Sequence, residues 1–497
     1  MMLNFLKAEA NRTYTENGAA AHMTTGSNCL DLFATVGALR NSTKEEIVDR
    51  FAKAYDENAN LAMKLLFYSR DIRGGLGERR VFRTILRWLA TNHSESVIKN
   101  LNYIAEFGRY DDLLELMNTP CEQEMLTLIK AQFAEDQRLL GNNGAVSLLG
   151  KWLPSVNASN AQTVNNAKKI ARALGMKDAE YRKALTALRA RIKIIENSLR
   201  EKDYTFDYDA QPSRALLKYR KAFYRNDQVR YDSYLSEVLE GKAYLNAENV
   251  SPYELVEPYL SWENWHSNRS YMKALSEQEK KVLNATWKSL PEFGRKGNAL
   301  AVIDTSGSMY SYGKPMPASV ALSLGLYFAE HNKGHFKNHF ITFSERPQLV
   351  ELKGNTFVDR LQYAASFSEC ANTNLEAVFD LILFAAARNR VKQRDLPEAL
   401  YIISDMEFDS CVENASATVF ENAKRKFAVY GYTLPKVVFW NVMSRNKQQP
   451  VTMNEQGVAL VSGATPRLFS MALSGELSPY KLMMDTLTGK RYERIVA

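Results

Sequence analysis

Short apolar runs that each end in an aspartate place the strongest constraint on the fold of this chain. Ala299–Ile303 is followed by Asp304, and Ala399–Ser404 is followed by Asp405. Three further strand-like runs and four helix-like segments share this region: His339–Phe343, Val437–Trp440, Val458–Val461, Val320–Glu330, Thr356–Ala365, Leu375–Ala387 and Lys481–Leu487. Alternating strands and helices predict a mostly parallel, doubly wound α/β domain over residues 298–497. Ligands of such sheets bind at the carboxyl ends of strands, where both aspartates fall.

Oxygen-bearing side chains gather in the loops after these strands. The string VIDTSGSM puts Asp304, Ser306 and Ser308 at alternate positions directly after a strand. A second loop, NTNLEAVFD, places Thr373 just before a helix, and a third, IISDMEFD, contains Asp405. Carboxylate and hydroxyl oxygens are hard donors, which suit Mg²⁺ or another divalent cation such as Mn²⁺ or Ca²⁺. The sequence therefore predicts one divalent-metal site at this edge of the sheet.

This ordered set resembles the metal-ion-dependent adhesion site (MIDAS) of von Willebrand factor A domains. That site combines an Asp-x-Ser-x-Ser loop, a threonine from a second loop and an aspartate from a third. The resemblance implies metal-ligand roles for Asp304, Ser306, Ser308, Thr373 and Asp405. It also implies a coordination position kept for an acidic residue of a protein partner. The alternative is a metal-free A domain, and Met406 stands where the family often has glycine.

The region from residue 1 to 290 has the periodicity of helices. Apolar residues recur at helical spacing in six segments: Ile47–Tyr55, Asn60–Ser69, Arg80–Ala90, Val164–Leu174, Ala179–Leu199 and Ser213–Tyr224. Short joints separate the segments, which is typical of an α-solenoid, although no clean repeat period stands out. We therefore expect a multidomain chain with an all-α region first and the α/β domain second.

Positive charge is concentrated within the helical region. The net charge of the chain is +8, and the stretch from Lys151 to Leu245 alone contains 19 Lys and Arg against 11 Asp and Glu. Such an excess indicates an anionic partner, most simply nucleic acid, while the alternative is a set of solvated helix faces. The candidate contacts in this stretch are Lys168, Lys169, Arg172, Arg189, Arg191, Lys218, Arg220 and Lys221.

A second basic cluster surrounds a glycine-rich turn. Arg70, Arg73, Arg79 and Arg80 flank the turn at residues 74–77. Backbone N–H groups at a helix start can bind an anion, so we count these arginines among the candidate RNA contacts. The competing interpretation is a plain helix–helix joint with a glycine cap.

The helical region contains the strings TENGAAAHMTTGSNCLDLF, LLFYSRDIRGGLGER, GRYDDLLEL, LLGKWLP and PSRALLKYRKAF. These strings resemble an uncharacterised family of bacterial, viral and plant proteins. That family is distantly similar to the TROVE-domain, or Ro-type, ribonucleoproteins. The architecture of those proteins is a solenoid or ring of HEAT-like repeats followed by a von Willebrand A domain. The resemblance implies binding of structured or misfolded noncoding RNA and of single-stranded RNA ends, by analogy of architecture.

Other function classes find little support in the sequence. Cys29, Cys121, Cys370 and Cys411 are scattered, which argues against a disulfide framework or zinc finger and favours a reducing cytoplasm. No apolar stretch has the length of a membrane span, and P-loop, HExxH and GxSxG motifs are absent. A hydroxyl-rich single-metal site has too few carboxylates for a two-metal nuclease. We therefore expect a binding protein rather than an enzyme, with a metal-dependent adaptor that binds no RNA as the alternative.

Overall fold

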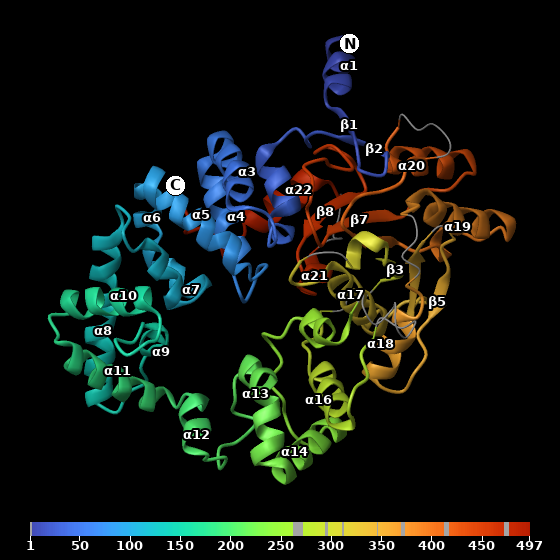
Figure 1. Ribbon diagram of the computed structural model, residues 1–497. Helices are drawn as coiled ribbons and strands as arrows, with labels where there is room; N and C mark the ends of the chain where they lie inside the picture. Colours follow the sequence, from blue (N-terminus) through green and yellow to red (C-terminus); the bar gives the residue numbers. More distant parts are fainter. Residues whose placement is uncertain are drawn as a thin grey trace. The chain divides into compact units, whose positions relative to one another are not determined.

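Figure 1 shows the computed structural model, which describes residues 2–261, 272–293, 297–310, 313–344, 346–368, 373–411, 417–471 and 477–497. The chain forms two compact units. Met1–Asn58 and Val238–Arg491 make up the first, which we call the sheet unit. Ala59–Glu237 and Tyr492–Ala497 make up the second, which we call the helical unit. No helix among the described residues is long and apolar enough to cross a membrane.

A six-stranded mixed sheet in the order β5-β4-β3-β6-β7-β8 organises the sheet unit. Its strands are β3 (Ala299–Asp304), β4 (His339–Phe343), β5 (Leu349–Glu351), β6 (Ala399–Ser404), β7 (Lys436–Asn441) and β8 (Val458–Ser462). Five strands are parallel, and β5 runs antiparallel to β4 at one edge. Ile303 pairs with Ile403, so the carboxyl ends of β3 and β6 lie side by side.

Helices cover both faces of this sheet, as the alternating sequence pattern predicted (Figure 1). On one face, α19 (Leu375–Arg388) and α20 (Val419–Val429) share a buried core with Val302 of β3. On the other, α17 (Pro317–His331) packs so closely that a Cβ at Gly325 would overlap Ile303. Neighbouring residues of a strand point to opposite faces, so β3 is buried along its whole length.

The first 58 residues belong to the sheet unit, although we expected them in a helical region reaching residue 290. They include an antiparallel hairpin of β1 (Arg12–Tyr14) and β2 (Ala20–His22), so the expected all-α character is wrong for this segment. Helix α2 (Asn28–Thr35) packs on β8, and a Cβ at Gly37 would overlap the carbonyl oxygen of Ser462. Strands of three residues are too short to leave a periodic pattern in the sequence.

Further elements of the sheet unit complete its layers. They are α1 (Met2–Ala10), η1 (Val36–Ala38), α3 (Lys44–Glu57), η4 (Pro252–Leu255), η5 (Glu257–Tyr259), α16 (Glu277–Lys288), η6 (Gly307–Tyr310), α18 (Phe357–Ala365), η7 (Gln393–Asp395), α21 (Leu468–Met471) and α22 (Pro479–Leu487).

The described residues of the helical unit form helices joined by short connections. These are α4 (Ala59–Arg70), α5 (Arg79–Asn92), α6 (Ser94–Lys99), η2 (Leu101–Tyr103), α7 (Ile104–Phe107), η3 (Tyr110–Leu116), α8 (Glu122–Gly141), α9 (Leu149–Trp152), α10 (Ala161–Ala173), α11 (Asp178–Ile192), α12 (Ile195–Glu201) and α13 (Ser213–Asn226). Helix α14 (Gln228–Glu240) crosses the boundary between the units. The single helix expected over Ala179–Leu199 is in fact two, because Lys193 adopts a left-handed φ of 53° and ends α11.

Candidate functional site

The first predicted loop folds around Asp304, the last residue of β3. Its carboxylate is fully buried, and Oδ1 accepts a hydrogen bond of 2.9 Å from the backbone N–H of Ser306. The hydroxyl oxygens of Ser306 and Ser308 lie 3.1 Å apart, as the short helix η6 turns the chain. The structure therefore brings together the three oxygen-bearing side chains of the first loop.

The third loop joins the first through Ser404, the last residue of β6. The Ser404 hydroxyl donates to Asp304 Oδ2 at 2.5 Å. The next residue, Asp405, is also buried, and its Oδ2 lies 2.9 Å from Nη2 of Arg445. Sequence analysis singled out neither Ser404 nor Arg445, although Arg445 follows β7, the next strand end along the same edge of the sheet.

Burial controls the electrostatics of this site. Loss of hydration raises the pKa of Asp304 to about 7, and the negative charge of Asp405 acts in the same direction. Two buried carboxylates beside two hydroxyls fit a hard divalent cation, which would compensate their charge. Among the described residues, no three His, Cys, Asp or Glu side chains gather as a metal cluster would. A cation here would therefore depend on hydroxyl oxygens for part of its coordination.

Thr373, from the second loop, precedes α19 and is tied to the third loop. Its hydroxyl is 2.7 Å from the carbonyl oxygen of Glu407 and 3.0 Å from Oδ1 of Asp409, and it accepts a bond of 2.9 Å from Asn17. The Thr373 hydroxyl is thus engaged with backbone and side-chain partners of the third loop. All three predicted loops therefore meet at one edge of the sheet. Ser404 joins the third loop to the first, and Thr373 joins the second loop to the third.

Met406 adopts a backbone conformation that favours glycine. Its φ is 69°, in the left-handed region that disfavours residues with a Cβ. Its side chain is nevertheless buried in the core beneath α19 and α20. Packing of the Met406 side chain therefore offsets the backbone strain.

The N-terminal segment Thr15–Ala19 lies against the third loop, a contact that sequence analysis missed. The Thr15 hydroxyl donates to the carbonyl oxygen of Phe408 at 2.6 Å, and Asn17 Nδ2 donates to that of Glu407 at 2.8 Å. Glu16 Oε2 lies 2.8 Å from Nη1 of Arg445. The string TENGAAAHM had drawn attention in the sequence, but no local pattern indicates a contact nearly 400 residues away.

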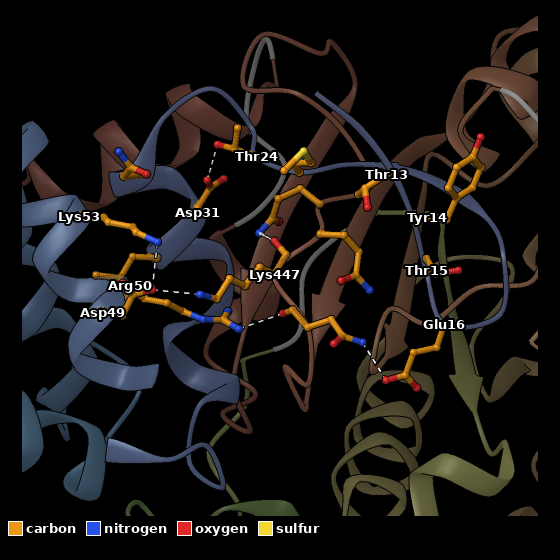
Figure 2. Close-up of a pocket in the computed structure, with 16 residues that line it drawn as sticks. Thr13, Tyr14, Thr15, Glu16, Thr24, Asp31, Asp49, Arg50, Lys53 and Lys447 are labelled. Carbon is orange, nitrogen blue, oxygen red and sulfur yellow. Dashed lines mark hydrogen bonds and ion pairs between the residues drawn. The ribbon is translucent and has the colours of Figure 1, made fainter. Parts of the chain in front are cut away.

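A cavity of about 700 Å³ lies beside this segment. Figure 2 draws the residues that line it. Its lining residues come from β1, α2, α3 and the loop after β7: Thr13, Tyr14, Thr15, Glu16, Met23, Thr24, Asn28, Asp31, Leu32, Asp49, Arg50, Lys53, Asn446, Lys447, Gln448 and Gln449. Arg50 donates to the carbonyl oxygen of Asn446 at 3.0 Å, and the Asn446 amide donates to Glu16 at 2.8 Å (Figure 2). A chain of polar contacts therefore leads from the cavity wall through Glu16 to Arg445 and Asp405.

Among the predicted RNA contacts that have structural partners in the helical unit, five are Arg70, Lys169, Arg189, Arg191 and Arg220. Arg70 is buried with Asp112, and its Nε and Nη2 both lie 2.8 Å from Oδ2 of that residue, so it is not a surface contact. The other four cap helix ends or pair with neighbouring groups. Arg189 donates to the carbonyls of Gly150 and Leu153, Arg191 to those of Asn143 and Gly144, Arg220 to that of Leu217, and Lys169 pairs with Glu122 at 3.1 Å.

The glycine-rich turn at residues 74–77 is a helix–helix joint. Three backbone N–H groups in the turn and directly after it bond to carbonyl oxygens of α4 and its end: Gly75 to Asp71, Leu76 to Tyr68 and Glu78 to Ser69. These donors are therefore unavailable to an anion. Around the turn, Arg73 donates to the Glu106 carbonyl, Arg79 pairs with Asp111 at 2.8 Å, and Arg80 is exposed.

The remaining candidates lie on α10 and α13. Within the described part of the chain, Lys168, Arg172 and Lys221 make no side-chain hydrogen bond or ion pair. Arg172 and Lys221 are exposed, and Lys168 is partly exposed. Lys218, also exposed, contacts the Tyr219 hydroxyl at 2.8 Å. Arg182 and Lys183 on α11 add two more exposed cations with the same lack of partners.

Fold and site together define a protein with a helical unit and a mixed α/β sheet unit whose strand ends gather buried oxygen donors. The chain belongs to the family described as "Domain of unknown function (DUF2828)", which it matches over residues 15–138 and 127–296. Residues 298–486 match a second family, "Domain of unknown function (DUF7788)". The two matches meet near residue 297, whereas the compact units divide the chain near residues 58 and 238.

Two individual proteins are similar over nearly the whole chain. An uncharacterised protein of Acanthamoeba polyphaga mimivirus is 31% identical over 516 aligned positions, covering 96% of this chain and 87% of the viral protein. The crystal structure of the Ro (RSR) protein of Deinococcus radiodurans aligns over 93% of both chains with 14% identity and a TM-score of 0.38. A TM-score of that size does not establish a common fold.

Proposed function

We propose that this protein binds RNA through the helical unit and holds one divalent cation at the strand ends of the sheet unit. The RNA class would be structured or misfolded noncoding RNA with single-stranded ends, as in the Ro-type proteins, to which the family that the sequence strings resemble is distantly similar in architecture. The protein would bind RNA without cleaving it, in a reducing cytoplasm. In this proposal the helices are HEAT-like repeats and the sheet unit contains a von Willebrand A-type domain.

One observation carries the RNA proposal: the cations of α10, α11 and α13 that lack partners. Lys168, Arg172 and Lys221 make no described side-chain contact, and Arg182 and Lys183 lie on the helix between α10 and α13. Exposed cations that are not neutralised locally can contact phosphates and release the counterions of a nucleic acid. The same residues could simply keep the surface soluble, so the proposal needs a binding measurement.

Filter binding of a single-stranded RNA across a series of salt concentrations tests this proposal. The triple variant Lys168→Glu, Arg172→Glu, Lys221→Glu should bind more weakly and should show a shallower dependence of log affinity on log salt. Each lost phosphate contact removes about 0.7 from the slope on a single strand. The matched control, Lys130→Glu, Arg138→Glu, Arg200→Glu, makes the same change in charge on α8 and α12. Equal loss in both variants would mean that the total charge, rather than this surface, attracts RNA.

The metal proposal assigns ligand roles to Asp304, Ser306, Ser308, Thr373 and Asp405. Mg²⁺ is the preferred ion, with Mn²⁺ or Ca²⁺ as substitutes, because all five side chains offer hard oxygens. Support comes from the burial of the two carboxylates and the closeness of the two serine hydroxyls. Calorimetric titration with Mg²⁺ should give one site in the wild type and none in Asp304→Ala. Equal affinities of both proteins would remove this assignment.

A second candidate function is a metal-dependent adaptor that binds a protein and no RNA. The cavity of about 700 Å³ beside Glu16 favours it, because it offers room near the strand-end site for side chains of a protein partner. In this function the cation would hold an acidic residue of the partner. Absence of RNA binding at low salt, together with normal metal binding, would favour the adaptor. Metal-dependent loss of full-length RNA would instead show that the protein is an enzyme.

A further inference from the structure

The guanidinium of Arg445 links a buried carboxylate to a partly exposed one. Nη2 lies 2.9 Å from Asp405 Oδ2, and Nη1 lies 2.8 Å from Glu16 Oε2. The side chain of Asp405 has no exposed surface, whereas that of Arg445 is 31% exposed and that of Glu16 is 46% exposed. Arg445 therefore reaches from the surface into the strand-end site.

Arg445 supplies Asp405 with the positive charge that a buried carboxylate requires. The other oxygen of Asp405, Oδ1, accepts a bond of 3.3 Å from the backbone N–H of Glu407. Both oxygens are thus engaged before any metal is added. A divalent cation bound to Asp405 would meet the like charge of Arg445 across a site shielded from water, where such repulsion is strong.

We propose that Arg445 is a built-in counter-cation that competes with the divalent metal for Asp405, and that Glu16 keeps it in place. This inference rests on the proposed metal site and adds a residue that sets its affinity. When the metal enters, Arg445 leaves both Asp405 and Glu16 and turns toward solvent at the edge of the cavity. The affinity of the site for metal is therefore lower than its oxygen ligands alone would give.

The surrounding contacts permit this movement. The segment around Glu16 is anchored through other groups, because Thr15 bonds to the Phe408 carbonyl and Asn17 to the Glu407 carbonyl. The Glu16 carboxylate also accepts a bond of 2.8 Å from the Asn446 amide at the cavity wall (Figure 2). Glu16 is therefore a fixed acceptor that holds Arg445 against Asp405, and the partly exposed Arg445 can turn away from both carboxylates without disturbing the core.

Calorimetric titration of the full-length protein with Mn²⁺ tests the competition. Arg445→Gln should bind Mn²⁺ about tenfold more tightly than the wild type, because a charge-assisted hydrogen bond no longer has to be broken. Glu16→Gln, which keeps Arg445 but weakens its anchor, should give a smaller gain of about threefold. Lys447→Gln is the matched control: it removes a neighbouring cation that pairs with Asp49 at 3.0 Å rather than with Asp405, and it should leave the affinity unchanged.

Thermal unfolding provides a second readout. In EDTA, Arg445→Gln should melt at a lower temperature than the wild type, because Asp405 stays buried without a counter-cation. Saturating Mn²⁺ should then raise the melting temperature of Arg445→Gln by more than it raises that of the wild type. If Arg445→Gln does not fold in EDTA, the Mn²⁺ affinity of Glu16→Gln decides the question alone.

The outcomes separate this inference from the proposed metal site. If the wild type binds Mn²⁺ and neither Arg445→Gln nor Glu16→Gln binds it more tightly, Arg445 does not compete and only the inference fails. If all three variants, including Lys447→Gln, bind Mn²⁺ more tightly than the wild type by the same factor, the cause is the general loss of charge and not Arg445 in particular. If no protein binds Mn²⁺, the metal site and the inference fall together.

Discussion

Asp304 and Asp405 of the sheet unit have no exposed side-chain surface, whereas Arg172 and Lys221 of the helical unit are exposed and make no described contact. A buried charge must be compensated inside the protein, so its partners reveal what kind of group the site accepts. An exposed charge is compensated by water and salt, so its surroundings reveal little. The strand-end site can therefore be argued from geometry, while the basic helices require a binding experiment.

The same contrast recurs within the helical unit. Arg70 and Arg172 are both arginines, and both are among the predicted RNA contacts. Arg70 is buried against Asp112, and Arg172 is exposed on α10. Burial, rather than residue type, thus separates arginines that hold the fold from arginines that can meet a partner.

The largest expected effect tests this separation. Arg70→Ala removes one of the two arginines that pair with the buried Asp112. The other, Arg83, has its Nε 2.6 Å from Oδ1 of Asp112 and remains. We expect Arg70→Ala to lower the free energy of unfolding of the helical unit by about 3 kcal/mol or more. Arg172→Ala should change it by less than about 0.5 kcal/mol. Urea unfolding followed by circular dichroism measures both. Equal stability of the two variants would mean that Arg70 does not hold the fold.

A second prediction concerns the first 58 residues. Gly37→Ala should destabilise the sheet unit by about 2–3 kcal/mol, because the new Cβ overlaps the backbone carbonyl of Ser462 at the end of β8. Gly141→Ala is the control, since a Cβ there meets nothing within 4 Å at the end of α8. It should be neutral or slightly stabilising. Urea unfolding of both variants measures the difference. If Gly37→Ala is as stable as the control, the N-terminal segment does not pack closely on the sheet.

Much of the α/β fold could be predicted from the sequence because its strands are buried on both faces. The apolar runs at residues 299–303 and 399–403 are continuous, and each is bounded by polar residues. The break between α11 and α12 was missed because the residue in the left-handed conformation there is Lys193, rather than the glycine that usually marks a helix end in a sequence. The hairpin of β1 and β2 was missed because three-residue strands carry no period.

The candidate site could likewise be predicted only in part from the sequence. Asp304, Ser306 and Ser308 are neighbours in the chain, so a local pattern was enough to group them. Glu16 and Asn17 reach the site only through tertiary packing, and a single sequence contains no signal for such a contact. Arg445 stands between these cases, because its place after β7 could have been noticed once the strand order was known.

The third prediction concerns the pH dependence of the sheet unit. The pKa of Asp304 is raised to about 7 in the folded protein, so the folded state holds a proton that the unfolded state releases near pH 4. Stability should therefore fall as pH rises from about 4 to about 7 and stay low above that range. In EDTA, Asp304→Asn should remove this dependence and be more stable than the wild type at pH 8. Melting temperatures at pH 5 and pH 8 test it, and parallel profiles of the two proteins would contradict it.

The smallest expected effect concerns Met406, where backbone strain and side-chain burial oppose each other. Met406→Gly relieves a left-handed φ that costs a residue with a Cβ about 1–2 kcal/mol, but it also removes a buried side chain worth about 2–4 kcal/mol. We therefore expect a net loss of about 1–2 kcal/mol. Met406→Ala loses nearly the same burial and keeps the strain, so it should be less stable than Met406→Gly by about 1 kcal/mol. Urea unfolding of the three proteins should thus rank the wild type first, glycine second and alanine last. A reversed order of glycine and alanine would mean that the third loop relaxes out of the left-handed conformation, and that packing alone fixes its shape.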